Sequence, residues 1–184
     1  ACLTASFDWK LNSMVTASHK FSQDIYDGAQ YLLSMLAENI DNIREVNEDG
    51  IHFMCEAYHW IAENSANMNH TMWESASEHN TFDNMEYICK KSFLHGQIIG
   101  MTVYFMSLLQ NNQHERARMM LQRLGIDITL KGLGITEEQL RTCLLTVREF
   151  TEKRGLRYTI VNAKPITPEW VDMAVQKYYS DFPQ

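Results

Sequence analysis

The sequence predicts an all-α fold, a multi-helix bundle, and three observations lead to this prediction. Apolar residues recur with the i, i+3, i+4, i+7 spacing of a helix along almost the whole chain. Residues typical of helix ends stand where these periodic segments begin and stop. No segment sustains the apolar–polar alternation of a strand, and no internal repeat is present. We therefore expect about seven to nine helices with short connections and no sheet.

Four segments carry a continuous apolar stripe along one helix face, which must pack on neighbouring helices. In chain order, the residues of these stripes are Ile25, Ala29, Leu32, Leu33 and Leu36; Ile51, Met54, Cys55, Tyr58, Ile61 and Ala62; Leu140, Cys143, Leu144, Val147 and Phe150; and Trp170, Val171, Ala174, Val175 and Tyr178. A fifth segment differs, because its apolar residues between Ile98 and Leu109 cover all sides of a helix. We expect this fifth helix in the centre of the bundle.

Helix boundaries are marked at three places. Thr136 and Gln139 have the spacing of a capping box, in which each side chain bonds the backbone of the other. Thr167 followed by Pro168 is typical of a helix start, and Gly125 follows an amphipathic segment as a helix stop.

Two segments break the helical period. Residues 127–134 include two glycines and are interpreted as a loop, whereas residues 158–161 are interpreted as a short extended piece.

Composition favours one packed domain over residues 1–184. The apolar fraction of 45% and the charged fraction of 21% are typical of a globular core rather than of a disordered chain. The formal net charge is −7 and no stripe of Lys and Arg forms, which argues against a nucleic-acid partner.

Features of a membrane or secreted protein are missing from the sequence. The longest apolar stretch, residues 94–109, is shorter than the ~20 residues that a spanning helix needs. The four cysteines form no CxxC pair, which favours reduced thiols. We expect no membrane contact and a cytoplasmic location. Because the chain opens on Ala1 rather than Met, we also expect it to begin inside a longer protein.

Two histidines are candidate metal ligands, His79 and His95, each at the predicted start of a helix. Imidazole is a common ligand of zinc and iron, and two helix starts are able to bring two rings to one ion. From spacing alone, a polar cap or a hydrogen-bonded core histidine remains the alternative for each. His52 and His59 are expected at the rim of a helix face. His19, His70 and His114 are expected at the solvated surface.

The chain resembles a known enzyme family in several motifs. Ser77-Glu-His79 followed by Leu94-His-Gly-Gln-Ile-Ile-Gly100 resembles the paired histidine motifs of the iron-containing alcohol dehydrogenase and dehydroquinate synthase superfamily. Further segments resemble the glycerol-1-phosphate dehydrogenase group within it: Phe7 to Leu11, Leu133 to Leu140, Arg157 to Asn162 and Thr167 to Trp170. The resemblance therefore covers nearly the whole chain.

The resemblance implies a C-terminal helical domain of the dehydroquinate synthase type, without the Rossmann-like N-terminal domain that binds the nucleotide. No glycine-rich turn of a dinucleotide site occurs in the chain, so NAD(P) is expected only in the intact protein. The isolated chain is expected to be inactive, and the intact protein is compatible with a homo-oligomer. The implied reaction of phospholipid metabolism interconverts dihydroxyacetone phosphate and glycerol 1-phosphate, so the expected substrate is a small polyol or polyol phosphate.

The resemblance also implies a metal, zinc or another divalent ion, held by two histidines and one aspartate. His79 and His95 match the two histidines. The aspartate is expected upstream of residue 1, and Asp8 is not expected to be that ligand.

Three positions depart from the family pattern. Gln97 stands where the family usually has glutamate. Residues 70–75 replace a loop with serine, arginine and proline, and residues 80–84 replace a stretch that usually carries another histidine. These departures fit an enzyme of the family that acts on a different substrate. The alternative is a non-catalytic helical module with an interaction or regulatory role. A lyase like dehydroquinate synthase ranks last, because the first half of the chain is poor in Lys and Arg.

Overall fold

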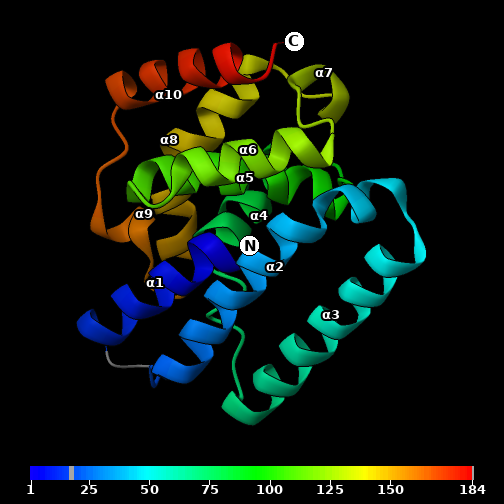
Figure 1. Ribbon diagram of the computed structural model, residues 1–184. Coiled ribbons are helices and arrows are strands. Elements are labelled where there is room, and N and C mark those ends of the chain that lie inside the picture. The colour runs from blue at the N-terminus through cyan, green and yellow to red at the C-terminus, as the bar shows by residue number, and fades with distance from the viewer. Residues whose placement is uncertain (17–18, 184) are drawn as a thin grey trace.

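A computed structural model describes residues 1–16 and 19–183, and this part of the chain forms ten helices and no strand (Figure 1). In chain order these are α1 (Cys2–Val15), α2 (Gln23–Glu45), α3 (Glu48–Met68), α4 (Ser77–Cys89), α5 (His95–Gln110), α6 (His114–Leu124), α7 (Leu130–Leu133), α8 (Glu137–Lys153), α9 (Ile160–Ala163) and α10 (Pro168–Asp181). The prediction of an all-α bundle is confirmed. No helix in the described part has both the length and the apolar character that crossing a membrane requires.

The structure has more helices than predicted because two short helices form in segments that were predicted to be a loop and an extended piece. Within the predicted loop 127–134 lies α7, whose first turn is capped by Thr129, since its side chain accepts a hydrogen bond from Gly132 N at 3.0 Å. The predicted extended piece 158–161 runs into α9 instead. There Thr159 N donates to Asn162 Oδ1 at 3.0 Å, and this local bond closes a helical turn.

The central helix is α5, as predicted. From Ile98 to Gln110 every residue except Leu108 is buried. α5 contacts α1, α4, α6 and α9, so its apolar residues are covered from several sides. The largest core cluster joins it to α8 and α10 through side chains such as Phe105, Val147 and Tyr178.

The predicted helix ends also occur. Gln139 N donates to Thr136 Oγ1 at 3.1 Å, and Thr136 N donates to Gln139 Oε1 at 2.8 Å, which completes the capping box of α8. Thr167 caps α10 ahead of Pro168. Gly125 ends α6 in the left-handed conformation, with φ 68°.

Helices α2 and α3 form a hairpin at the edge of the molecule. Figure 1 shows α3 beside α2 and away from α8 and α10. Gly50 is the one buried residue of α3, in its first turn, where it lies against the backbone of Asn42 near the end of α2. The expectation that the apolar stripe of this helix is covered is therefore wrong, because Ile51 and Tyr58 are 51% and 64% exposed. Helix α3 has one principal neighbour, so most of its surface stays open.

Candidate metal centre

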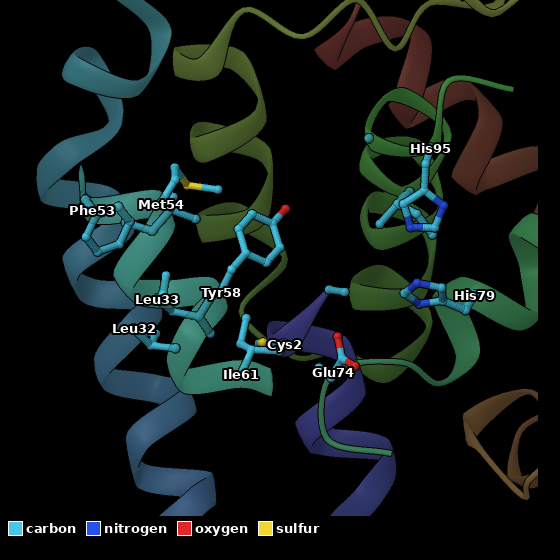
Figure 2. A pocket seen from close by; sticks show the side chains of 15 residues that line it. Cys2, Leu32, Leu33, Phe53, Met54, Tyr58, Ile61, Glu74, His79 and His95 are labelled. Atoms are coloured by element: carbon cyan, nitrogen blue, oxygen red, sulfur yellow. The ribbon is translucent and has the colours of Figure 1, made fainter. Parts of the chain in front are cut away.

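His79 and His95 lie next to each other, although they come from different helices. His79 is in the first turn of α4 and His95 is the first residue of α5. Their ring centroids are 5.2 Å apart and the ring planes are inclined by 44° (Figure 2). Two imidazoles on one tetrahedral ion, with metal–nitrogen bonds of ~2.0–2.1 Å, have ring centroids about 5 Å apart. The spacing of the two rings thus fits a shared metal ion.

Glu78 orients the His79 ring. One carboxylate oxygen, Oε1, lies 2.8 Å from His79 Nδ1 and also accepts a hydrogen bond from Ala76 N at 2.8 Å. The other oxygen accepts from Thr4 Oγ1 at 2.8 Å. A carboxylate acceptor requires that Nδ1 carries the proton, which leaves Nε2 as the lone-pair nitrogen. Carboxylate–histidine pairs of this kind orient metal-binding histidines in many metalloproteins.

Glu78 is fully buried, yet its surroundings keep it charged. Burial alone raises the pKa of this carboxyl group. The hydrogen bond with His79 and the positive charge that this ring carries when protonated lower the pKa most, the bond from Ala76 N lowers it further, and the pKa lies below its ordinary value. The sequence places Glu78 directly before His79, and this adjacency is the signal that could have revealed its role.

Asp8 anchors the start of α4 from α1. Its two oxygens accept hydrogen bonds from Ser77 N at 3.2 Å and from Ile160 N at 2.7 Å. Ser77 and Ile160 are the first residues of α4 and α9, so the carboxyl group faces two helix N-termini. Burial raises the pKa of Asp8 to about 7. Both oxygens are engaged in hydrogen bonds within the fold.

The surroundings of His95 are more open. Its ring packs edge to face with the Phe82 ring, and the two centroids are 5.1 Å apart. Partial burial lowers the pKa of His95, and so does the nearby charge of His79. Glu74, in the loop before α4, lines the same cavity as the two histidines (Figure 2). Burial raises the pKa of Glu74.

A third ligand is not evident in this centre. Within residues 1–16 and 19–183, no group of three or more His, Cys, Asp or Glu side chains is arranged to hold a metal ion. The described residues thus supply a histidine pair rather than a complete ligand set.

Comparison with known proteins shows sequence similarity to one group of enzymes. No family model matches the chain. It is 26% identical over 167 residues to glycerol-1-phosphate dehydrogenase [NAD(P)+] of Methanosphaera stadtmanae, covering 91% of this chain and 47% of that protein. The proteins of the same name from Aeropyrum pernix and Thermococcus kodakarensis are 24% and 26% identical over 179 residues, covering 95% of this chain and 48% of each.

The chain is similar in sequence to the C-terminal half of the glycerol-1-phosphate dehydrogenases.

It spans about half the length of the relatives it matches, and the matched part is their C-terminal half. The resemblance seen in the motifs is therefore confirmed, as is the assignment to a C-terminal helical domain.

The positions that depart from the glycerol-1-phosphate dehydrogenase pattern have structural explanations in part. Gln97 donates through Nε2 to Asp127 O at 3.2 Å, which ties the start of α5 to the connection between α6 and α7. Within residues 80–84, Phe82 packs against His95. In the loop 70–75, Glu74 places a carboxyl group beside the histidine pair.

The remaining histidines fall into two groups. His52 and His59 are exposed on α3, as expected. The expectation of a solvated surface is wrong for the other three, which are half-buried. His19 and His70 stack edge to face at 5.0 Å, and His114 lies 4.6 Å from the Tyr104 ring. Contacts between distant segments cover these rings, and such contacts leave no local sequence signal.

Proposed function

We propose that this chain is the metal-carrying helical part of an NAD(P)-dependent dehydrogenase, with His79 and His95 as two ligands of zinc or another divalent ion. The observation that supports this proposal most directly is the placement of the two rings 5.2 Å apart, with Glu78 oriented on His79. The similarity to glycerol-1-phosphate dehydrogenases supplies the reaction class. The reference substrate pair is glycerol 1-phosphate and dihydroxyacetone phosphate.

The donor set suits the proposed ion. Neutral imidazole nitrogens bind zinc well, and the buried Glu78 carboxylate orients the His79 ring. An aspartate outside the described residues would complete three protein ligands, as in the family that the sequence resembles. When bound, the ion would act as a Lewis acid toward the oxygen of an alcohol or ketone.

The residues of this chain position the reacting groups. Glu78 holds a proton of His79 on Nδ1 and so leaves Nε2 as the nitrogen that faces the proposed ion. Phe82 restricts the His95 ring from one side. In the implied reaction, the alcohol carbon gives a hydride to NAD(P)⁺ and the hydroxyl group releases a proton, which yields the ketone and NAD(P)H.

The nucleotide is assigned to another part of the intact protein. The chain has no glycine-rich strand-to-helix turn, and no residue here is proposed to bind NAD(P). The nucleotide-binding domain is therefore a required partner, and the chain by itself is expected to be inactive. A cytoplasmic location completes the proposal.

Elemental analysis of the intact natural protein tests the metal site. We expect about one zinc per chain after supply of zinc, and a loss of most of it in His79→Ala and in His95→Ala. His52→Ala, at an exposed position of α3, is the matched control and should keep its zinc. A folded protein that stays metal-free in the presence of zinc would contradict the proposal and favour the non-catalytic helical module.

A further inference from the structure

The α2–α3 hairpin carries the net negative charge of the chain. Residues 23–68 contain nine Asp and Glu residues and one basic residue, Arg44, which gives this hairpin a formal charge of −8, against −7 for the whole chain. All nine carboxylate side chains are exposed. Within the described part of the chain, Asp41 is the one carboxylate of the nine that pairs with an arginine. The acidic character of the protein is therefore concentrated at the edge of the molecule where Figure 1 shows this hairpin.

A groove lies between the two helices of the hairpin and is formed by α2 and α3 alone. It encloses about 320 Å³, and we call the residues that line it the hairpin groove: Gly28, Tyr31, Leu32, Met35, Phe53, Glu56, Ala57 and Trp60. Most of these side chains are apolar, and none is Lys or Arg. Tyr31 is 64% exposed, and the other large side chains of the floor are half-buried. An apolar surface of this kind gains free energy when another molecule covers it.

The floor of the hairpin groove is held in place by packing around Trp60. A methyl group at position 28 would lie 2.4 Å from the Trp60 ring, so glycine at this position lets the ring lie close to the backbone of α2. The ring also packs edge to face on the buried Trp73, with centroids 5.2 Å apart. A side chain that is already fixed loses little conformational freedom when a partner binds. The groove is thus preformed.

Carboxylates border the hairpin groove on both helices. Glu56 lines the groove itself, and Glu63 lies beside Trp60 in an adjoining hollow of α3. On α2, Asp27 precedes Tyr31 by four residues and Glu38 follows Met35 by three. Residues at these spacings are neighbours on a helix surface. The groove therefore combines an apolar floor with acidic margins.

This combination indicates the chemistry of the occupant. A second copy in a twofold dimer would place each acidic hairpin against its own equivalent, and like charges oppose such an association. Nucleic acids and anionic lipid surfaces are repelled for the same reason. A basic segment is attracted by the carboxylates instead. Lys and Arg side chains also bind over exposed aromatic faces such as that of Tyr31.

We propose that the hairpin groove binds a basic amphipathic segment of a partner protein. Apolar side chains of the segment lie between Tyr31 and Trp60, and its Lys or Arg side chains lie over Asp27, Glu38 and Glu56. An amphipathic helix that lays its apolar face into a groove is a common mode of peptide recognition. The proposal goes beyond the proposed dehydrogenase function and needs no metal ion, so each is tested without the other.

Calorimetric titration of the intact natural protein with a synthetic peptide tests the proposal. The peptide is an amphipathic helix of about five turns, with Leu and Trp on one face and Lys and Arg on the other. One matched peptide has Glu in place of Lys and Arg, and a second has Ser in place of Leu and Trp. We expect measurable binding of the first peptide alone, an affinity that falls as salt rises, and protection from hydrogen exchange in α2 and α3. Equal binding of either matched peptide, or protection confined to other helices, overturns the proposal.

Variants of exposed residues locate the binding surface. Asp27→Lys combined with Glu56→Lys should weaken binding by about tenfold, because both attractions become repulsions. Glu138→Lys, at an exposed position of α8, is the control and should leave the affinity unchanged. Tyr31→Ser should weaken binding by about fivefold or more, whereas Tyr87→Ser, at the same exposure of 64% on α4, should not. Unchanged affinity in both hairpin variants overturns the proposal.

Sedimentation of the intact protein tests the other occupants of the groove. We expect the same oligomeric state in the unmodified protein and in Tyr31→Ser. If the protein is a dimer that Tyr31→Ser dissociates, the groove holds a second copy and the proposal is wrong. If the intact protein does not bind the basic peptide, the groove is covered by another part of the protein or has no basic partner, and the proposal is wrong as well.

Discussion

The Asp8 carboxyl group accepts a hydrogen bond from Ile160 N at 2.7 Å, across a sequence separation of 152 residues. Its second oxygen accepts from Ser77 N, at the start of the helix that carries His79. A single buried group therefore connects α1 with the N-termini of α4 and α9. The candidate metal centre depends on this connection, because the first turn of α4 positions Glu78 and His79.

Asp8 should make the stability of the fold depend on pH. Its pKa rises from 3.8 in the unfolded chain to about 7 in the folded protein, so the folded state binds more protons between these values. The free energy of unfolding should then fall by roughly 3 kcal/mol from Asp8 alone between pH 5 and pH 8. Asp8→Asn should remove this part of the pH dependence.

Urea unfolding at several pH values, followed by tryptophan fluorescence, measures this effect. Asp24→Asn, at an exposed position of α2, serves as the control and should keep the unmodified pH profile. Parallel profiles for Asp8→Asn and the unmodified protein would show that Asp8 ionises in the fold without cost.

Glu78→Gln should weaken metal binding without removing either histidine. The amide oxygen still accepts from Ala76 N and from His79 Nδ1, because one oxygen takes both bonds, but the negative charge beside the ring is lost. We expect a loss of about 10-fold to 100-fold in zinc affinity. Chelator competition on the intact protein measures it, with Glu63→Gln on the exposed part of α3 as control. Equal affinities for both variants would rule out a role for the negative charge of Glu78 in metal binding.

Gly50→Ala should destabilise the α2–α3 hairpin. A methyl group at this position would lie 2.4 Å from Asn42 O, and this neighbour is backbone that cannot rotate away. Alanine normally stabilises a helix relative to glycine by about 0.5–1 kcal/mol, so a loss of about 1–3 kcal/mol would reverse the usual sign. Gly96→Ala, where a methyl group meets nothing within 4 Å, should show no loss in the same unfolding assay. A stable Gly50→Ala protein would mean that the helices separate easily.

Asn84→Ala should loosen the packing of α4 on α8. The buried Asn84 amide donates to Cys143 O at 2.9 Å and to Thr146 Oγ1 at 3.1 Å. Removal of the amide leaves the buried Cys143 carbonyl and the half-buried Thr146 hydroxyl without this donor, and should lower the free energy of unfolding by about 1–3 kcal/mol. Thr146→Ala removes one of the two acceptors and should cost less. A larger loss in Thr146→Ala would place the main contribution at the hydroxyl group.

Much of the helical architecture follows from local sequence. The stripe of Leu140, Val147 and Phe150 and the capping box of Thr136 each involve residues a few positions apart. The same holds for α5, whose uniform apolar character predicts its central place. His79 and His95 were predicted at helix starts and as one metal site, and the motif resemblance was needed to pair them.

Tertiary structure alone decided the remaining features. Glu78 contacts Thr4, and Asp8 accepts hydrogen bonds from two backbone amides, across segments that are distant in sequence. The burial of His70 and His114 depends on packing between helices. The open stripe of α3 belongs to the same class, because periodicity shows which face of a helix is apolar but not what covers it. Local hydrogen bonds and side-chain spacing determine where helices form, whereas the packing of distant segments determines which polar groups meet and which apolar surfaces stay exposed.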